Sequence, residues 1–303
     1  MLILILINPQ RYMDATTDGL ALFVGKVFPT LFPFMIICKI LTMIGVGNLM
    51  SRIMKKPVQA LYNTSSISGY IMTLSMLSGY PIGAKLVADF VNDGELTIED
   101  AKCIISFTST SGPLFILGTI GIKMLGDYKA GVLILASHFI STLLNGLLYR
   151  GDYKEVNKLD LISFNDSDFF TQSVSSSINS ILIVGANIIF LNLFIVVLND
   201  MEVLELLSAL LGFCGIDKCI STGIVSGLIE ITRGASIISE TINIKDTIVP
   251  ISTIVSFGGV SVFLQSMVFL KPIGISARYY LLTKVSQAII TYVLSSILVL
   301  LLY

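Results

Sequence analysis

The chain has 303 residues, of which 54% are hydrophobic and 13% are charged, with a net charge of −1 and a mean hydropathy of +0.88. About a quarter of the residues of a soluble domain are charged, so this composition predicts an all-α polytopic membrane protein with the lipid bilayer as its surroundings. The balanced charge and the lack of any basic tail or stripe argue against a nucleic-acid partner.

The chain opens with a short apolar run, residues 1–7. Seven residues cannot cross a bilayer and show no signal-peptide pattern, so we expect a shortened first helix or an interfacial segment. Residues 17–47 predict one spanning helix, kinked by Pro29 and Pro33. Three basic residues within 52–56 then predict a cytoplasmic loop.

Interrupted apolar segments follow in both halves of the chain. In the first half we predict two broken elements and one unbroken spanning helix: 66–91 broken at 79–83, 98–126 broken at 108–113, and 130–149. In the second half we first predict a spanning helix, 173–199, and a short helix, 203–216. The same order then follows: 218–239 broken within 227–234, 247–270 broken at 258–259, and the unbroken helix 276–302. Residues 151–172 are the one long polar stretch between them.

This order predicts two structural repeats, residues 1–150 and 173–303, joined by a polar linker at 151–172. Repeats built from broken helices or re-entrant hairpins are typical of secondary transporters, and we infer an inverted orientation. Ser78-Gly79 is followed after five residues by Lys85, and Ser226-Gly227 is followed after five residues by Arg233. A Ser-Phe-x-x-x-Ser motif follows each copy, at 106–111 and 256–261.

A break inside the bilayer is tolerated only where it is buried in protein or lines a wet cavity, and the half-helix after it begins with free N–H groups that attract anions. Lys85 and Arg233 lie in the first turn after each break. If the halves are symmetric, they could hold a small dianion between them. Alternatively, Lys85 could extend to the interface and Arg233 could pair with Glu230, three residues earlier.

Glu230 is an acidic group at membrane depth, which is costly and indicates function. Three roles stay open: binding a substrate donor, carrying a coupling proton, or neutralising Arg233. The hydroxyls in the breaks could face the ligand or satisfy freed backbone groups. The candidate substrate-binding residues are therefore polar or flexible residues at the breaks: Gly79, Tyr80, Pro81, Gly83, Lys85, Thr108, Ser109, Ser111, Gly227, Glu230, Thr232, Arg233, Ser256, Ser261 and Gln265.

We expect no enzymatic activity, because the sequence has no HExxH, no GxSxG and no paired acidic metal motif. The four cysteines lack metal spacing, and the single histidine, His138, is expected to make an interhelical hydrogen bond. We therefore predict no catalytic residue, no metal site and no cofactor. Whether a proton or sodium ion is coupled to transport stays open, as does oligomerisation.

Several of these motifs resemble the YlbJ family of sporulation integral membrane proteins, also called SpoVV. The resemblance covers nearly the whole chain and is carried by 27–34 (VFPTLFPF), 78–85 (SGYPIGAK), 106–118 (SFTSTSGPLFILG), 227–234 (GLIEITRG) and 256–261 (SFGGVS). That family belongs to a wider group with a nucleoside-recognition or gate domain, and is similar to concentrative nucleoside transporters.

The resemblance implies an inverted-repeat transporter fold and translocation of dipicolinate, a pyridine dicarboxylate, during sporulation. It also implies a place in the outer forespore membrane of a bacterium. Gly112 stands where the family pattern has Asn. A nucleoside or nucleobase carrier of the same fold is the alternative function, and a non-transport subunit of a sporulation assembly is a further one.

Overall fold

A computed structural model describes residues 2–43, 46–151 and 169–303, and every regular element within these ranges is helical. Four of the helices in these ranges are long and apolar enough to cross a membrane: Tyr128–Leu148, Ser173–Asp200, Ile244–Leu270 and Ala277–Leu302. The prediction of an all-α membrane protein is therefore confirmed. Most of the predicted linker, 152–168, lies outside the described residues.

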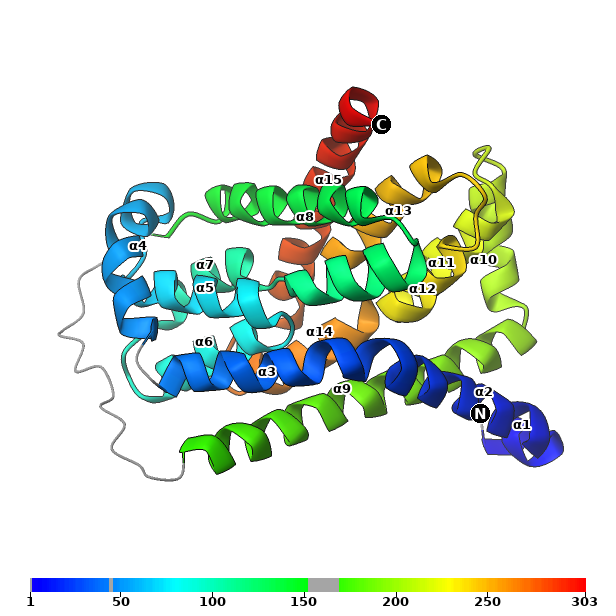
Figure 1. Cartoon of the computed structure of the whole chain (residues 1–303), viewed down its shortest axis with the longest axis horizontal. Coiled ribbons are helices and arrows are strands. Elements are labelled where there is room, and N and C mark those ends of the chain that lie inside the picture. Colours follow the sequence, from blue (N-terminus) through cyan, green and yellow to red (C-terminus); the bar gives the residue numbers. More distant parts are fainter. Residues whose placement is uncertain (1, 44–45, 152–168) are drawn as a thin grey trace.

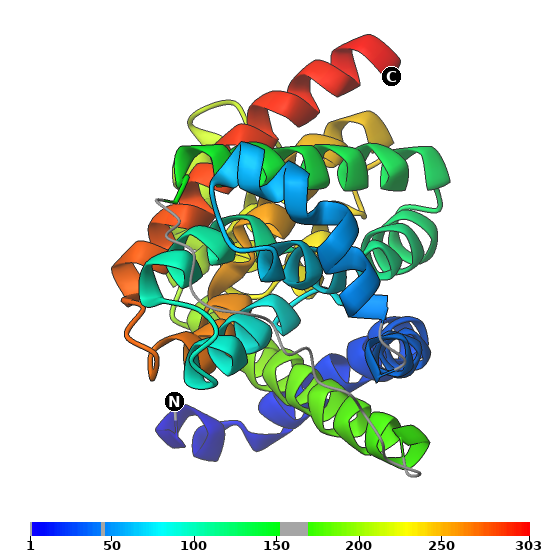
Figure 2. The ribbon, with the colours of Figure 1, turned by 90° about the vertical axis from the view of Figure 1, so that its left-hand side faces the viewer.

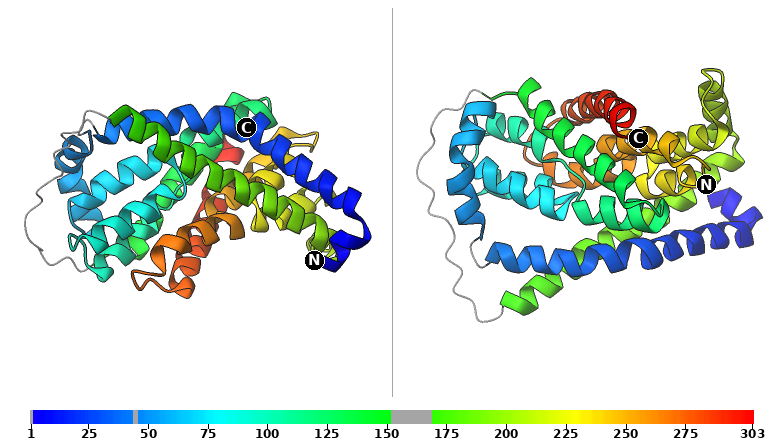
Figure 3. Two further views of the ribbon diagram at one scale, coloured as in Figure 1. Left: turned by 90° about the horizontal axis from the view of Figure 1, so that it is seen from below. Right: turned by 45° about the horizontal axis from the view of Figure 1, so that its top comes forward.

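Two long helical rods form one side of the molecule (Figures 1 and 3). The first consists of α2 (Pro9–Leu22), a π-helical stretch η1 (Phe23–Val27) and α3 (Phe28–Met43), and it packs along the second, α9 (Phe169–Asp200). Pro29 cannot donate a helical hydrogen bond, and the wide turn η1 lies next to it. The predicted kinked helix is present, but it begins before residue 17.

The close approach of these rods depends on a glycine and two polar links. A Cβ on Gly19 would lie 3.0 Å from the Ile189 backbone, so only glycine lets α2 pack this closely on α9. The Asn192 amide donates to the Ala15 carbonyl at 2.6 Å within the same contact. A salt bridge at the end of the rods, between Arg11 and Asp200, fixes their register.

Two further helices lie at the start of the chain and after α3, and the second of them differs from the prediction. The apolar start of the chain forms α1 (Leu2–Ile7), which has no buried residue. The basic segment that we predicted to be a loop is instead an amphipathic helix, α4 (Val46–Tyr62), and its basic side chains are exposed. Its apolar face packs on α5 and its charged face stays exposed, so the basic residues belong to a helix and the predicted loop is wrong.

The remaining helices form two sets of similar order. The first set is a helical hairpin, a broken helix and a long helix: α5 (Ile67–Ser78) and α6 (Ile82–Asn92), α7 (Ile98–Thr108) and π-helical η2 (Phe115–Met124), then α8 (Tyr128–Leu148). After α10 (Val203–Gly212), the second set follows: α11 (Lys218–Ile229) and α12 (Ile231–Ile238), α13 (Ile244–Phe257) and α14 (Gly259–Leu270), then α15 (Ala277–Leu302). That the two sets are inverted repeats stays a prediction.

The two sets interlock at the centre of the molecule, where α8 and α13 both pack against α15 (Figure 2). Buried hydroxyl and amide side chains link these helices, including a bond of 2.6 Å from the Thr291 hydroxyl to Ser141 and one of 2.6 Å from the Gln287 amide to Thr142. Such interhelical hydrogen bonds stabilise packing where lipid offers no partner. These bonds join α8 of the first set to α15 of the second set.

Candidate functional site

The tip of the first hairpin rests on the break of the following helix. Gly79 has a φ of +78°, and a Cβ there would lie 2.5 Å from the Gly112 nitrogen. A Cβ on Gly83 would collide with the Thr108 carbonyl oxygen. The Thr110 hydroxyl donates to the Ser75 carbonyl at 2.9 Å across the same contact. The predicted break glycines are thus required by backbone-to-backbone contact.

The second hairpin makes the equivalent contact with the second broken helix. Gly259 has a φ of +65°, and a Cβ there would lie 2.8 Å from the Gly227 carbonyl oxygen. The hairpin changes direction at Glu230, between α11 and α12, while Gly227 and Gly234 pack the two arms against each other. The break therefore falls inside the predicted range but on a glutamate.

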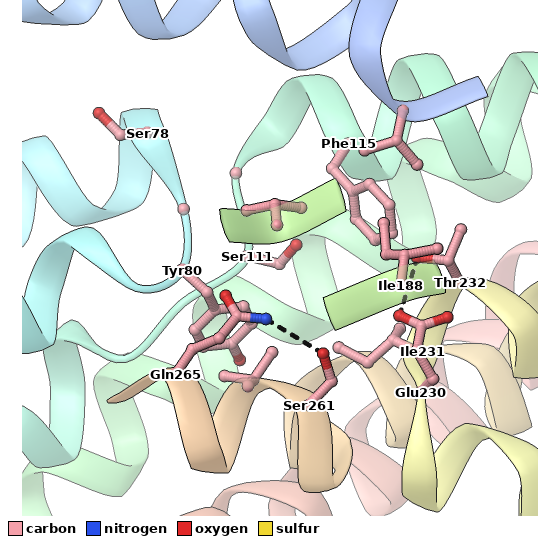
Figure 4. A pocket seen from close by; sticks show the side chains of 15 residues that line it. Ser78, Tyr80, Ser111, Phe115, Ile188, Glu230, Ile231, Thr232, Ser261 and Gln265 are labelled. Atoms are coloured by element: carbon pink, nitrogen blue, oxygen red, sulfur yellow. Dashed lines mark hydrogen bonds between the residues drawn. The ribbon is translucent and has the colours of Figure 1, made fainter. Parts of the chain in front are cut away.

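One pocket lies where these tips and breaks converge (Figure 4). Its polar wall comes from the hairpin tips and the helix breaks of both sets, and its apolar wall comes from η1, η2 and α9. The cavity has a volume of about 70 Å³. The lining residues are Val27, Ser78, Gly79, Tyr80, Ser111, Gly112, Phe115, Val184, Ile188, Glu230, Ile231, Thr232, Ser261, Val262 and Gln265.

The structure places about half of the predicted site residues in this lining. Those that line it are Gly79, Tyr80, Ser111, Glu230, Thr232, Ser261 and Gln265. Those that do not line it are Pro81, Gly83, Lys85, Thr108, Ser109, Gly227, Arg233 and Ser256. Several of the latter lie directly behind the lining, where they hold the tips and breaks in place.

Glu230 acts as the N-cap of α12. Its carboxylate accepts a hydrogen bond of 2.7 Å from the Arg233 backbone N–H and one of 3.1 Å from the Thr232 hydroxyl. Because Glu230 stands before the helix rather than within it, the Arg233 guanidinium forms no salt bridge with its carboxylate. Neutralisation by a helical ion pair is therefore not the role of Glu230 in this conformation.

The two matched cations lie outside the pocket. Lys85 is the fourth residue of α6, and Arg233 is the third residue of α12, so both do occupy the first turn after a break. Both side chains are partly buried, and the Arg233 Nε has no hydrogen-bond partner among the described residues. A clamp formed by these two cations stays a prediction.

Two hydroxyls outside the lining bond within a helix or to another helix. The Thr108 hydroxyl donates to the Ile104 carbonyl at 2.8 Å, and the Ser109 hydroxyl bonds to the Tyr280 hydroxyl at 2.7 Å. That such side chains satisfy freed backbone groups of the breaks therefore stays a prediction for these two residues.

His138 links the two broken helices. Its Nε2 accepts a hydrogen bond of 2.9 Å from the Ser111 backbone N–H, so Nδ1 carries the proton and donates to the Ser256 hydroxyl at 2.7 Å. The expectation of an interhelical hydrogen bond is confirmed, and there are two of them. The imidazole fixes the position of one pocket residue, Ser111.

Lys284 is a functional candidate that the sequence reasoning missed. It lies within α15 and is 2% exposed, and its ammonium donates to the Tyr80 hydroxyl at 2.9 Å, the Ser109 carbonyl at 3.0 Å and the Gln287 side-chain oxygen at 2.7 Å. The signal was available, because an ionisable residue inside a spanning helix indicates function by default.

Two other hollows are lined only by residues of the second half of the chain, and the larger one also collects polar groups, including Asp217, Glu240 and Lys245. A volume of about 500 Å³ between α11, α13 and α15 is lined mainly by aliphatic side chains. Another of about 820 Å³ lies beside the turns at Gly215 and Asn243. Within the described ranges, no group of three His, Cys, Asp or Glu side chains is placed to hold a metal ion.

Comparison with known proteins supports a transporter-like fold. No protein-family model matches the sequence. The chain is 24% identical to the sporulation integral membrane protein YlbJ of Bacillus subtilis (strain 168), over 93% of this chain and 76% of the relative. This similarity confirms the resemblance that the motifs indicated.

Solved structures of CNTnw, a concentrative nucleoside transporter, have the same fold. A variant in an intermediate state matches with a TM-score of 0.63 and 13% identity, over 90% of this chain and 76% of that chain. An inward-facing, substrate-bound state matches with a TM-score of 0.61 and 15% identity, over 92% and 75%. The chain is thus a membrane protein that is related to sporulation protein YlbJ and has the fold of the concentrative nucleoside transporters.

Proposed function

We propose that this protein is a membrane transporter that carries a small organic anion through the pocket between its helix breaks. The observation that carries the proposal is that hairpin tips and helix breaks from both sets converge on one pocket, which has a polar wall and an apolar wall. Broken backbone at membrane depth has a high free energy unless it lines a cavity, and solute binding by broken helices is the usual use of such a cavity.

The size of the pocket implies motion during transport. A volume of about 70 Å³ holds a few water molecules, whereas pockets for small organic ligands usually measure about 300–1,000 Å³. Val184 and Ile188 of α9 contribute to the apolar wall. Their side chains have no polar atom, so they make no hydrogen bond with the hairpin tips. We therefore expect the tips to move away from α9 when a ligand enters.

Dipicolinate is the substrate that we propose to test first. The resemblance to the YlbJ family points to it, and the relative is a sporulation protein by name. The polar wall offers neutral donors for a carboxylate: the hydroxyls of Tyr80, Ser111 and Ser261 and the amide of Gln265. On this proposal the protein would act in the outer forespore membrane.

A nucleoside is the second candidate substrate. The shared fold with CNTnw favours it, and so do Glu230 and Gln265, which place a carboxylate and an amide in the pocket for reading hydroxyls or a base. Neither group requires a charged ligand. A purely structural role in a sporulation assembly would leave the convergence of the breaks without a purpose.

Uptake by proteoliposomes tests the function. We would compare labelled dipicolinate, other dicarboxylates and uridine, each with and without sodium and pH gradients. Saturable dipicolinate uptake that unlabelled uridine does not inhibit supports the proposal. Saturable uridine uptake without dipicolinate uptake would instead support the nucleoside carrier, and no uptake of any solute would contradict transport.

Variants of the pocket and of the cations separate two versions of the site. Gln265→Ala changes a lining residue, whereas Lys85→Ala and Arg233→Ala change the predicted clamp. Lys271→Ala, an exposed position after α14, is the control. Loss of uptake only in Gln265→Ala would favour the pocket alone, and loss in all three would favour a clamp that forms in another conformation.

A further inference from the structure

The environment of Lys284 is unusual for a buried charge. An ammonium has three N–H donors, and all three are used by oxygens from three different parts of the chain: the first hairpin tip, the α7 break and α15 itself. No carboxylate of a described residue forms a salt bridge with this ammonium, so it is held by dipoles alone.

Tyr80 connects this charge to the pocket. Its side chain lines the cavity, its hydroxyl oxygen accepts the bond from Lys284, and the ammonium lies 4.9 Å from the centre of its ring. The hydroxyl proton is directed at the Val255 carbonyl at 3.3 Å, which is long for an O–H···O bond. A carboxylate oxygen could replace so weak an acceptor at little cost in free energy.

We propose that Lys284 and Tyr80 form a relay that makes this pocket selective for carboxylates. The ammonium polarises the Tyr80 hydroxyl, and that hydroxyl donates a charge-assisted hydrogen bond to a carboxylate of the substrate. This inference rests on the anion transport proposed above and adds the groups that would recognise the anion. It explains how a pocket whose lining contains no cation can attract one.

The opposite part of the pocket has a different character. Glu230 lies on the second hairpin, and its two capping bonds leave further lone pairs of its carboxylate free to accept. The other buried groups around Lys284 are hydroxyls, amides and the imidazole of His138, with Tyr280 bonded to Ser109 on one side. The ligand carboxylate is therefore expected at the Tyr80 end, away from the carboxylate of the protein.

Ligand binding by two single variants and the double variant tests the relay. Dissociation constants would be measured in detergent for dipicolinate and for pyridine-2,6-dimethanol, a neutral analogue of similar shape. We expect Tyr80→Phe and Lys284→Met each to weaken dipicolinate binding about 10- to 100-fold, the effect of one hydrogen bond to a charged group. Binding of the neutral analogue should change far less, and the double variant should bind no worse than the weaker single variant, because the two residues act as a unit.

Tyr279→Phe is the matched control, because it removes a tyrosine hydroxyl that, like that of Tyr80, donates to a backbone carbonyl. Tyr279 lies in α15, and its hydroxyl donates to the Lys102 carbonyl at 3.0 Å. The Tyr279→Phe variant should bind dipicolinate as the unaltered protein does. If Lys284→Met is not monodisperse, the relay is tested with two other variants. These are Tyr80→Phe and Lys284→Arg, which keeps the positive charge. Unchanged dipicolinate binding in a monodisperse Tyr80→Phe variant overturns the relay alone. Failure of the unaltered protein to bind any carboxylate overturns the proposed anion transport as well.

Discussion

Gly234→Ala should open the second hairpin. A Cβ at this position would lie 2.6 Å from both the Gly223 carbonyl oxygen and the Gly227 nitrogen, whereas ordinary contact begins at 3.4 Å. These are backbone atoms of α11, so no side chain can turn aside and the two arms must separate by about 1 Å. Overpacking of this kind costs about 1–3 kcal/mol, partly offset by up to about 1 kcal/mol because alanine favours a helix. We expect a net loss of about 1–2 kcal/mol.

Thermal stability in detergent, followed by size-exclusion chromatography after heating, would measure this loss. Gly212→Ala is the control, because a Cβ there meets no atom within 4 Å, and its midpoint should be unchanged or slightly raised. Gly227→Ala should lie between the two, because its Cβ would meet the flexible end of the Ile254 side chain at 2.7 Å. Equal midpoints for Gly234→Ala and Gly212→Ala would refute the argument from close packing.

Three further changes test how the helices are held. His138→Phe leaves the buried Ser111 amide without its acceptor, so the thermal midpoint should fall by the equivalent of about 2 kcal/mol. Thr97→Ala removes the N-cap of α7 and should cost about 1 kcal/mol in the same assay. The hydrogen bond from the Tyr303 hydroxyl lowers the pKa of the Asp127 carboxyl. The stability that this bond adds is therefore fully present above the ordinary aspartate pKa of 3.8 and is lost as the pH falls below it. Asp127→Asn should flatten the acid limb of the stability curve, and an unchanged limb would contradict this linkage.

The breaks could be predicted from the sequence because they are local. Gly79 and Pro81 interrupt a helix by their own backbone properties, and Gly258 ends α13 at a φ of +90°. The hairpin turn at Glu230 could not be placed to the residue in the same way. There the glycines allow the arms to pack, and the direction changes at the residue whose carboxylate caps the next helix.

The positions of the charges depended on contacts between distant segments. Counting from each break placed Lys85 and Arg233 correctly in their first helical turns, but a position along a helix does not say which face meets the pocket. Lys284 reaches Tyr80 and Ser109 across more than 170 residues of chain, and periodicity carries no information on such a contact. Only its rarity within a spanning helix could have drawn attention to it.

The imidazole of His138 offers a spectroscopic view of both broken helices at once. It is the single histidine of the chain, and its two nitrogens bond to the Ser111 amide of one break and to Ser256, two residues before the other. Untagged protein labelled with ¹⁵N-histidine would therefore give imidazole resonances from one side chain, with no assignment needed. Movement of either break in lipid would change the hydrogen bond at one known nitrogen, so a magnetic resonance spectrum could follow the two helices separately through a transport cycle.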